Sequence, residues 1–446
     1  PELVGKCKAG AARNITAVEC DDDFDCNDNN ECTGDACVSG YCNYTSVSDG
    51  ASCSSGLCCG GTCNTTVCSD DAGCNDGNAC TVDSCLNANT CSAECSHVAI
   101  TSCVSGDSCC PRGCTLESSG DTDCPPKKCE QGTCGFAVGE KSVILRTVDA
   151  GAHWTQIPSP VVADFYDVVF VNSSHGYIVG LKSSPSEGVV LKTTDGGLTW
   201  TKQSTSFDGV FAYFYSVDFV NETAGFVTDM NGHVIYTSDG VTWVNKTKIP
   251  LMYTYGSDFI NATHGWVACG YKTVCRTTDG GNSWSLASGS SSGLTYTVQN
   301  VDFINATHGW ATEYGKDVMA TTDGGVTWST QNHVVVGVNY NADFEALDMI
   351  NASHGWAGGN YYWDGYASYR TIDGQNWNGY IVQPVNVFVR SMSFINASHG
   401  WATGNYQGRI WSTTDGGITW NVQFSTTKIL RAVTFLLEPD EMLENT

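Results

Sequence analysis

The sequence predicts an all-β protein: a seven-bladed β-propeller preceded by a disulfide-rich, loop-rich repeat region. The first observation behind this prediction is an eight-residue signature, cleanest as TTDGGLTW at 193–200, which occurs seven times. The second is the distribution of cysteine, because 23 of the 25 cysteines lie between Cys7 and Cys134. A regular repeat of this size is typical of propellers and solenoids. Cysteine at this density indicates a small fold held by disulfides in an oxidising compartment.

Residues 1–134 are expected to form tandem cysteine repeats at about 20–63 and 68–114, with a short third segment at 115–134. CNDNNECTGDAC in the first repeat matches CNDGNACTVDSC in the second, 48 residues later. The series Cys20, 26, 32, 37, 42 runs almost in step with Cys68, 74, 80, 85, 91. Apolar residues are sparse here, so disulfides must replace a hydrophobic core. Spacing alone leaves their connectivity open.

The cysteine count is odd, at 25. We expect Cys269 and Cys275 to pair with each other, which leaves 23 cysteines in the N-terminal region. One of these then lacks an intrachain partner. It is either a buried free thiol, a cysteine whose partner lies outside this sequence, or a bridge to another chain.

Residues 135–446 are expected to form the propeller. In the repeat at 166–204, four short β-rich segments are separated by turns, which is typical of one blade. In the signature, Asp and Thr can bond the backbone of the turn, Gly supplies a positive φ, and Trp covers the hairpin. The signature Asp recurs at Asp149, Asp195, Asp239, Asp279, Asp323, Asp373 and Asp415.

The two ends of this region predict how the ring closes. Residues 135–154 supply the second to fourth strands of a first blade, but not its innermost strand. RAVTFLLE at 431–438 matches the innermost strands of other repeats, such as RSMSFINA at 390–397. The C-terminal strand is therefore expected to complete the first blade, which gives seven blades.

The seven signatures resemble Asp-box (BNR) repeats. The full unit, a strand followed by N-x-[ST]-H-G-W and then TTDGG-x-TW, resembles the Ycf48-like photosystem II assembly factors over about residues 135–438. That family carries a basic patch. Here Arg146, Lys192, Arg276 and Arg370 stand three residues before their box Asp, but the other three blades have Tyr236, Ala320 and Ser412. A disulfide-rich chain also does not suit the compartment of photosystem assembly.

The cysteine run resembles the Cys-rich repeats of extracellular matrix proteins, notably those of slime moulds. The resemblance implies an extracellular structural or adhesive role.

Ten Asn-x-Ser/Thr sites accompany the cysteines and indicate a secreted eukaryotic glycoprotein. Six of them occupy the same turn between the first and second strands of a blade. Asn suits such a turn without any sugar, but all six keep Ser or Thr two residues later, which an Asn turn would not need. We therefore expect N-linked glycans at one end of the propeller. The ten sites are Asn14, Asn43, Asn64, Asn172, Asn221, Asn245, Asn261, Asn305, Asn351 and Asn396.

The formal net charge of −26 disfavours nucleic acid and anionic membranes as partners and allows Ca²⁺ or basic ones. The acidic clusters Asp21, Asp23, Asp25 and Asp70, Asp71, Asp76 are candidate Ca²⁺ ligands, or else solvated turns. A second candidate cation or ligand site is a ring of Asp218, Asp258, Asp302 and Asp348 on adjacent innermost strands. The alternative is that each of these four bonds backbone groups between blades.

No hydrophobic run is long enough to span a bilayer, so no membrane insertion is expected. Because no signal peptide is visible at Pro1, we interpret the chain as processed or trimmed.

A sialidase would need an arginine triad, and the six propeller arginines do not form that pattern. We therefore expect a secreted non-enzymatic glycoprotein that needs no cofactor. It would be a structural or adhesive subunit of an extracellular or cell-surface assembly such as a filament, through self-association or binding to other extracellular glycoproteins. The alternatives are a ligand-binding propeller for a peptide, glycan or cation, and a sialidase-like glycan hydrolase, which is disfavoured.

Overall fold

The computed structural model describes residues 19–54, 56–64, 68–88, 90–111, 123–124, 129, 133–207, 211–251, 253–288, 292–314, 318–334, 342–361, 366–382, 387–404 and 408–436. The chain divides into two compact units, Pro1–Pro126 and Lys127–Thr446. The division falls before the expected boundary at 134/135. Cys129 and Cys134 belong to the second unit because they pack in the hydrophobic core around Phe136 and Val138.

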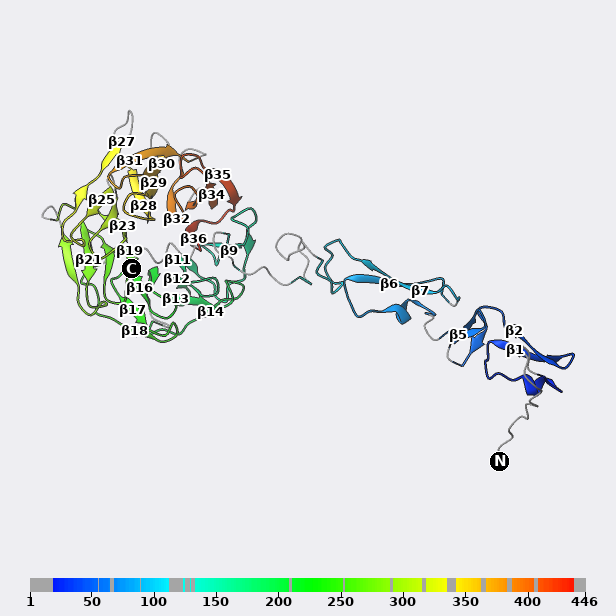
Figure 1. Ribbon diagram of the computed structural model, residues 1–446. Helices are drawn as coiled ribbons and strands as arrows, with labels where there is room; N and C mark the ends of the chain where they lie inside the picture. The colour runs from blue at the N-terminus through cyan, green and yellow to red at the C-terminus, as the bar shows by residue number, and fades with distance from the viewer. Residues whose placement is uncertain are drawn as a thin grey trace. The chain divides into compact units, whose positions relative to one another are not determined.

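The second unit is a seven-bladed propeller whose blades surround a central axis (Figure 1). Each blade is an antiparallel sheet with one strand next to the axis. From blade 1 to blade 7 these innermost strands are β36 (Leu430–Phe435), β11 (Asp164–Phe170), β15 (Phe214–Phe219), β19 (Thr254–Asp258), β23 (Val298–Phe303), β28 (Ala342–Met349) and β32 (Val389–Phe394).

The remaining strands follow outward from the axis. The second strands are β8 (Gly135–Gly139), β12 (Gly176–Ser183), β16 (Gly225–Asp229), β20 (Gly265–Cys269), β24 (Gly309–Glu313), β29 (Gly355–Tyr361) and β33 (Gly400–Gly404). The third strands are β9 (Ile144–Thr147), β13 (Ser186–Thr193), β17 (Val234–Thr237), β21 (Thr273–Thr277), β25 (Val318–Thr321), β30 (Tyr366–Thr371) and β34 (Arg409–Thr413). The outer strands are β10 (Thr155–Gln156), β14 (Thr201–Lys202), β18 (Trp243–Asn245), β22 (Ser285–Ser288), β26 (Ser329–Thr330), β31 (Asn376–Ile381) and β35 (Asn421–Ser425).

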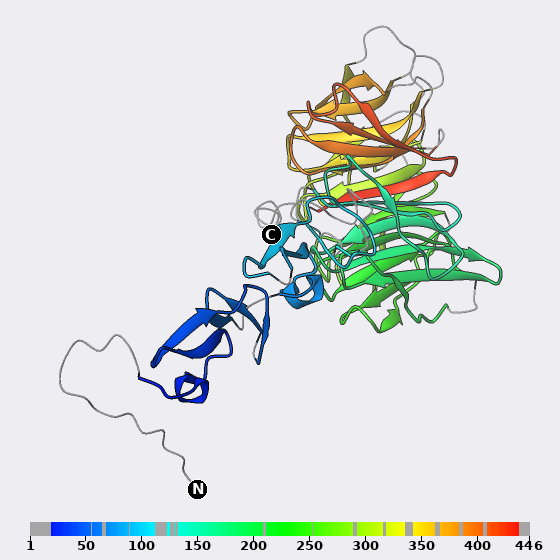
Figure 2. The same cartoon turned by 90° about the vertical axis from the view of Figure 1, so that its right-hand side faces the viewer.

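The C-terminal strand closes the ring. β36 pairs antiparallel with β8, so blade 1 is built from both ends of the unit (Figures 1 and 2). The expected strand extended to residue 438, and residues 437 and 438 lie outside the described part. Blade 6 carries a fifth strand, β27 (Asn332–Val334), which pairs parallel to β31.

Aromatic rings form the core between neighbouring blades. Phe303 of β23 stacks on Trp266 of blade 4, with ring centroids 3.6 Å apart, and meets the signature Trp328 of its own blade edge-on at 5.9 Å. The same three-ring contact recurs at other blade junctions, for example Phe394 between Trp356 and Trp420. These large buried rings fix the spacing of the blades.

The Asp-box signature is a self-contained turn, as its composition predicts. The Thr193 hydroxyl donates to Asp195 Oδ1 (2.8 Å), which also accepts the backbone N–H of Thr199 (3.0 Å). Gly196 and Gly197 have φ values of 71° and 76°, which side chains rarely adopt. The Asp side chains therefore act within the turn.

The described part of the first unit consists of two similar cysteine repeats. The first contains η1 (Asp23–Cys26), β1 (Thr33–Val38), β2 (Tyr41–Ser46), β3 (Ser52–Cys53), β4 (Gly56–Cys59) and β5 (Thr62–Asn64). The second contains η2 (Asp71–Cys74), β6 (Thr81–Leu86) and β7 (Glu94–Ala99). In both repeats a 3₁₀ turn precedes a two-stranded hairpin.

The disulfides repeat as well. Cys20–Cys37, Cys26–Cys42 and Cys32–Cys58 correspond to Cys68–Cys85, Cys74–Cys95 and Cys80–Cys109. Cys95, and not Cys91, therefore takes the place of Cys42, because it lies opposite Cys85 in the hairpin register.

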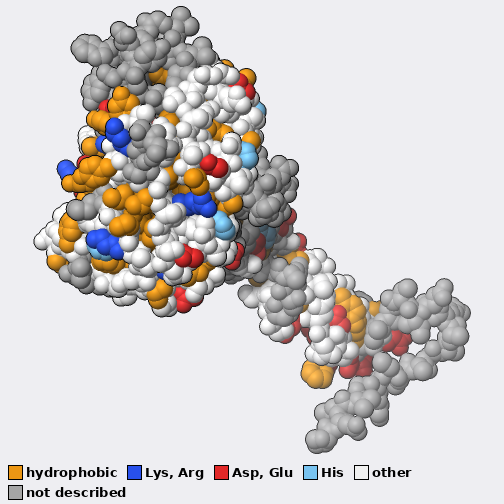
Figure 3. Space-filling view, turned by 90° about the vertical axis from the view of Figure 1, so that its left-hand side faces the viewer, with side chains coloured by type: hydrophobic (Ala, Val, Ile, Leu, Met, Phe, Trp, Pro, Cys, Tyr) orange, Lys and Arg blue, Asp and Glu red, His pale blue; other side chains and the backbone are white. Residues whose placement is uncertain are grey.

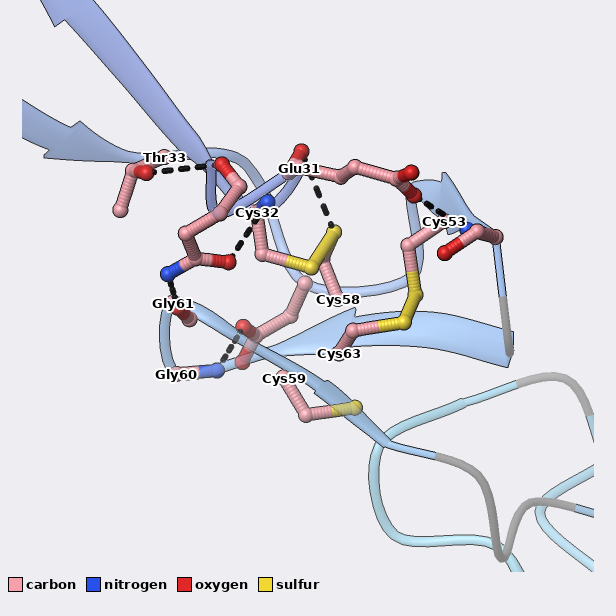
Figure 4. The surroundings of a disulfide bond; sticks show 12 residues. Glu31, Cys32, Thr33, Cys53, Cys58, Cys59, Gly60, Gly61 and Cys63 are labelled. Atoms are coloured by element: carbon pink, nitrogen blue, oxygen red, sulfur yellow. Dashed lines mark hydrogen bonds between the residues drawn. A yellow bond between two sulfur atoms is a disulfide. The ribbon is translucent and has the colours of Figure 1, made fainter. Parts of the chain in front are cut away.

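The displaced Cys91 bonds Cys59 of the first repeat. Figure 4 shows Cys59 pointing away from the Cys32–Cys58 bridge, while Cys53 bonds Cys63 beside it. Cys110 likewise bonds forward, to Cys124. The second cysteine of each Cys-Cys pair thus links its repeat covalently to the segment that follows.

All 23 cysteines in the described part of the chain are disulfide-bonded. They include the Cys129–Cys134 and Cys269–Cys275 pairs of the propeller unit. The total of 25 is odd, and the remaining two cysteines, Cys7 and Cys114, lie outside the described residues.

Candidate functional site at the propeller channel

A cavity of about 490 Å³ opens on the propeller axis. The innermost strands of all seven blades contribute to its lining. A volume of this size is within the range of ligand pockets in proteins. It is the candidate functional site.

A β-bulge shapes the entrance of this cavity. In each innermost strand the register with the second strand shifts near the N-terminal end, as between Phe165 and Asp167 in β11. A bulge re-aims the extra side chain, and six of the extra residues line the cavity. We call them the mouth residues: Tyr166, Tyr215, Gln299, Glu345, Arg390 and Arg431. In blade 4 the irregularity spans Thr254 to Ser257, and Gly256 lines the cavity.

The mouth residues combine aromatic faces with paired charges. Arg390 Nη1 lies 2.8 Å from Glu345 Oε2, and the Arg431 guanidinium lies 4.4 Å from the centre of the Tyr166 ring. Arg431 Nη2 also pairs with Glu140 Oε1, at 2.7 Å. Burial raises the pKa of Glu345, and the Arg390 charge opposes that shift. The mouth therefore offers cations, a carboxylate, an amide and aromatic rings at one place.

The predicted aspartate ring lines the same cavity, nearer the C-terminal ends of the innermost strands. The structure brings all four carboxyls to the lining, and one oxygen of each accepts a backbone N–H from the innermost strand of the next blade. Asp302 accepts from Met349 at 2.7 Å, and Asp348 accepts from Phe394 at 2.5 Å. Asp258 accepts from Phe303 at 2.5 Å, and Asp218 from Phe259. These bonds join each blade to its neighbour. Bonding of backbone groups between blades is the second of the two interpretations given above for the four aspartates.

Burial changes the protonation of this ring. It raises the pKa of Asp218 and of Asp348 to about 7, and that of Asp302 to about 8. The pKa of Asp258 is also raised well above its ordinary value, by burial and then by the neighbouring Asp218. Near neutral pH much of the ring is therefore uncharged. Among the described residues, none of the four belongs to a group of side chains spaced to hold a metal ion.

Sequence reasoning missed a fifth carboxyl, Asp167. Its Oδ2 accepts the backbone N–H of Val217 at 2.9 Å and the Ser216 hydroxyl at 3.2 Å. Burial raises its pKa to about 6. Asp167 stands three residues before Phe170, whereas each of the other four aspartates directly precedes a Phe or Met.

Most of the candidate Ca²⁺ ligands of the cysteine repeats accept hydrogen bonds from backbone N–H groups, and Ca²⁺ binding stays a prediction. Asp25 Oδ2 accepts the N–H of Asp21 (3.0 Å), and Asp70 Oδ1 accepts that of Gly73 (2.9 Å). Asp23 and Asp71 hold equivalent hairpin N–H groups, those of Cys37 and Cys85, at 2.6 and 2.8 Å. Within the described residues, Asp76 is the one member of the predicted set that lies in a group able to hold a metal.

The six turn sequons have a structural role that their spacing did not reveal. Asn261 Oδ1 accepts the backbone N–H groups of Thr263 and His264, and also the Thr263 hydroxyl at 2.8 Å. The same hydroxyl bond occurs at Asn221, Asn305, Asn351 and Asn396. In five of the six turns the Ser or Thr therefore also has a structural role, and glycosylation at these sites stays a prediction.

The other sequons are dispersed. Asn43 is exposed on β2, and Asn245 on β18 accepts the Ser206 hydroxyl at 2.5 Å. Asn14 and the side chain of Asn64 lie outside the described part.

The basic residues that precede the Asp boxes do not form a surface patch. Arg146 Nε donates to Gly196 O at 2.9 Å, and Lys192 Nζ donates to Gly240 O at 3.0 Å. Each acceptor is a carbonyl in the box turn of the next blade. In blade 4, Trp266 Nε1 makes this contact instead, with Gly324 O at 2.8 Å. These side chains therefore stabilise the ring of blades.

The exposed charges are also dispersed on the side of the propeller drawn in Figure 3. That side carries hydrophobic, basic and acidic side chains in small groups among uncharged ones. No helix among the described residues has the length and apolarity to cross a membrane.

The fold and the axial cavity define a seven-bladed Asp-box propeller that follows disulfide-rich repeats, and its blades resemble those of Ycf48-like proteins. The family described as "Photosynthesis system II assembly factor YCF48" matches residues 152–253. The chain is 27% identical over 145 residues to the photosystem II assembly lipoprotein Ycf48 of Synechococcus sp. (strain CC9902). The match covers 31% of this chain and 41% of that protein, so it spans less than half of the relative.

Solved structures share the propeller fold. A GH74 xyloglucanase from Xanthomonas campestris aligns with a TM-score of 0.52 at 12% identity, over 69% of this chain and 52% of that one. YCF48 from Cyanidioschyzon merolae aligns with a TM-score of 0.49 at 18% identity, over 60% and 88%. YCF48 bound to a D1 peptide gives 0.47 at 20% identity, over 60% and 83%. At such identities the likeness is one of fold alone.

Proposed function

We propose that the protein is a secreted, non-enzymatic glycoprotein whose propeller binds a ligand at the channel mouth. The observation that carries this proposal is the layer of bulged residues around the 490 Å³ cavity. If the innermost strands only held the blades together, they would not need aromatic and cationic side chains at the bulged positions.

The chemistry of the mouth favours a peptide segment as the ligand. Tyr and Arg are the side chains that most often dominate the energetics of protein recognition. Tyr166 and Tyr215 stack with ring centroids 5.5 Å apart. Arg390 and Arg431 pair with Glu345 and Glu140, and would exchange these partners for an acidic side chain of the ligand. Gln299 can bond the amides of a peptide backbone.

The predicted glycans would leave this mouth uncovered. The six turn sequons follow the C-terminal ends of the innermost strands, whereas the mouth residues stand near the N-terminal ends. Sugars and ligand would therefore occupy opposite ends of the propeller.

A peptide library displayed on phage, selected on the full chain, tests the binding site. We expect selected peptides to lose at least about tenfold in affinity on Tyr166→Ala or Arg431→Gln, since each removes a contact at the centre of the mouth. Lys202→Gln, on the outer strand β14, is the matched control. Equal binding to all variants, or the failure of any peptide to bind, would refute the mouth as a peptide site.

A second candidate function is that of a connector or adhesive subunit in an extracellular assembly. The Cys59–Cys91 and Cys110–Cys124 bonds, which join consecutive segments covalently, favour it. Light scattering behind size exclusion, with and without reductant, tests it on the native glycoprotein. Oligomers that dissociate under reductant support it, and a monomer in both conditions contradicts it.

A further inference from the structure

Three metal-ligating side chains converge in the second cysteine repeat. His97 Nδ1 lies 2.8 Å from Asp83 Oδ1 and 3.6 Å from Asp76 Oδ2. The three ligand atoms all lie within 4.8 Å of one another. Asp76 precedes the hairpin, Asp83 is on β6 and His97 is opposite it on β7.

The backbone of the turn fixes the orientation of both carboxylates. Asp83 Oδ2 accepts the N–H of Asp76 at 3.2 Å. Asp76 Oδ1 accepts the N–H of Asn78 at 2.8 Å and the hydroxyl of Thr81 at 3.1 Å. One oxygen of each carboxylate is thus committed to the turn, and the other faces the imidazole. Such outer bonds are what orients the ligands of metal sites.

The first repeat contains the same turn without the imidazole. Asp28 N–H donates to Asp35 Oδ2 at 3.2 Å, and Thr33 donates to Asp28 Oδ1 at 3.0 Å. The hairpin register places Tyr44 opposite Asp35, where the second repeat has His97 opposite Asp83. Asp35 Oδ1 there is buried and has no hydrogen-bond partner among the described residues. The two repeats therefore differ at this position by one nitrogen ligand.

We propose that His97, Asp83 and Asp76 form a binding site for a divalent transition metal, with Zn²⁺ as the best fit. One imidazole nitrogen and two carboxylate oxygens form a ligand set that zinc accepts, at bond lengths of about 2.0–2.2 Å. Ca²⁺ and Mg²⁺ prefer sites made of oxygen alone. The side chains of His97 and Asp76 are 37% and 33% exposed, so the ion can enter from solvent and keep water at its remaining positions.

Calorimetric titration of the full chain with ZnCl₂ at pH 7.5 tests the proposal through binding itself. We expect one site in the micromolar range, and at least a tenfold loss of affinity in His97→Tyr, which copies the first repeat. Tyr44→His is the reciprocal variant and should add a second site, at Asp28 and Asp35. A titration that is the same for the native chain and His97→Tyr overturns the proposal.

Asp76→Asn provides a second test of zinc binding in case the His97→Tyr variant does not form its disulfides. This variant retains the Oδ1 acceptor of the turn but replaces the oxygen that faces His97. We expect it to bind zinc at least about tenfold more weakly with an unchanged disulfide map, and unchanged binding would also overturn the proposal.

Discussion

The position of each aspartate on the propeller axis explains both its bond to the next blade and its raised pKa. Its carboxyl reaches the backbone N–H of the next blade, as Asp302 reaches Met349, and the same burial raises its pKa. A buried N–H without an acceptor costs about 1–3 kcal/mol. Burial therefore favours the protonated form of these aspartates, whereas the backbone hydrogen bond, as from Met349 to Asp302, favours the charged form.

The propeller should lose stability as the pH rises from 5 to 8. The pKa of Asp302 is raised to about 8 and those of Asp218 and Asp348 to about 7, above the value of about 4 expected in an unfolded chain. The folded state thus binds more protons than the unfolded state, and the free energy of unfolding falls with rising pH. Tryptophan fluorescence measures this, because all 13 tryptophans lie at or after Trp154.

A lower melting temperature at pH 8 than at pH 5, by at least about 3 °C, is the expected result. Asp302→Asn keeps the acceptor without a titrating group, so it should reduce the pH dependence. The rise in stability on lowering the pH should end below about pH 4, because the Asp-box carboxylates have lowered pKa values and lose their charge there. At Asp279 the main cause of the lowered pKa is the hydrogen bond from the Ser283 hydroxyl. A melting temperature that rises from pH 5 to 8 would contradict this account of the ring.

The turn sequons allow a test that separates sugar from structure. Ala262→Pro abolishes the sequon at Asn261 but keeps Asn261 and Thr263, whose side chains bond each other. Proline suits this position of a turn, so the stability should change by no more than about 1 kcal/mol. Intact-glycopeptide mapping should show the glycan at Asn261 lost in the variant and the other five turn sites still occupied. Six bare asparagines in the native protein would refute the prediction of a glycan ring.

At the scale of the blade, the sequence predicts the strands better than their irregularities. The alternation of Tyr166–Val171 and the box turn at Asp195 are local signals, so four strands per repeat and the closing strand could be deduced. The bulges could not, because they arise where seven inner strands crowd around one axis. The mouth residues were missed for that reason, and only the recurrence of large polar residues just before each inner strand's apolar run could have indicated them.

The first glycine of each second strand is a requirement of blade packing. A Cβ at Gly309 would lie 2.4 Å from Phe303 Cδ1, and Phe303 is held against Trp266 at 3.6 Å. We expect Gly309→Ala to destabilise the propeller by about 1–3 kcal/mol, since overpacking forces the ring to move. Denaturant unfolding followed by tryptophan fluorescence measures the loss.

Phe303→Leu in the Gly309→Ala background provides the control. It makes room for the new methyl group, so the double variant should be less unstable than the sum of the two single ones. Val326→Ala, at a side chain that is 53% exposed, should have little effect. Additive losses would show that the close approach of Phe303 is not the cause.

At the scale of the whole molecule, the two units are stabilised by different means. The propeller has a core of buried rings, whereas the described part of the cysteine repeats buries few apolar side chains other than cysteine. The sequence predicts this difference from composition. It could not predict that Cys91 bonds back to Cys59, since the choice between Cys91 and Cys95 depends on the hairpin register.

Mild reduction should therefore affect the two units differently. Reduction can begin at the Cys74–Cys95 bond, because Cys95 is exposed, whereas Cys134, Cys269 and Cys275 of the propeller are fully buried. We expect dithiothreitol to make residues 1–126 sensitive to protease while the tryptophan melting temperature changes by less than about 3 °C. Mass spectrometry of the digest locates the cleavage. A propeller that melts early under these conditions would show that it depends on the disulfides of the repeats.

The closure of blade 1 has a consequence for how a cell makes this protein. Glu140 and Arg431, which pair beside the seam, are 291 residues apart. At about 5–20 residues per second, the ribosome needs roughly 15–60 s to deliver the strand that covers β8. Until then the β8 edge of the nascent chain has no partner strand, and an unpaired edge can pair with another chain and lead to aggregation. The cysteine repeats precede the propeller in the chain, so this open edge belongs to the propeller unit alone.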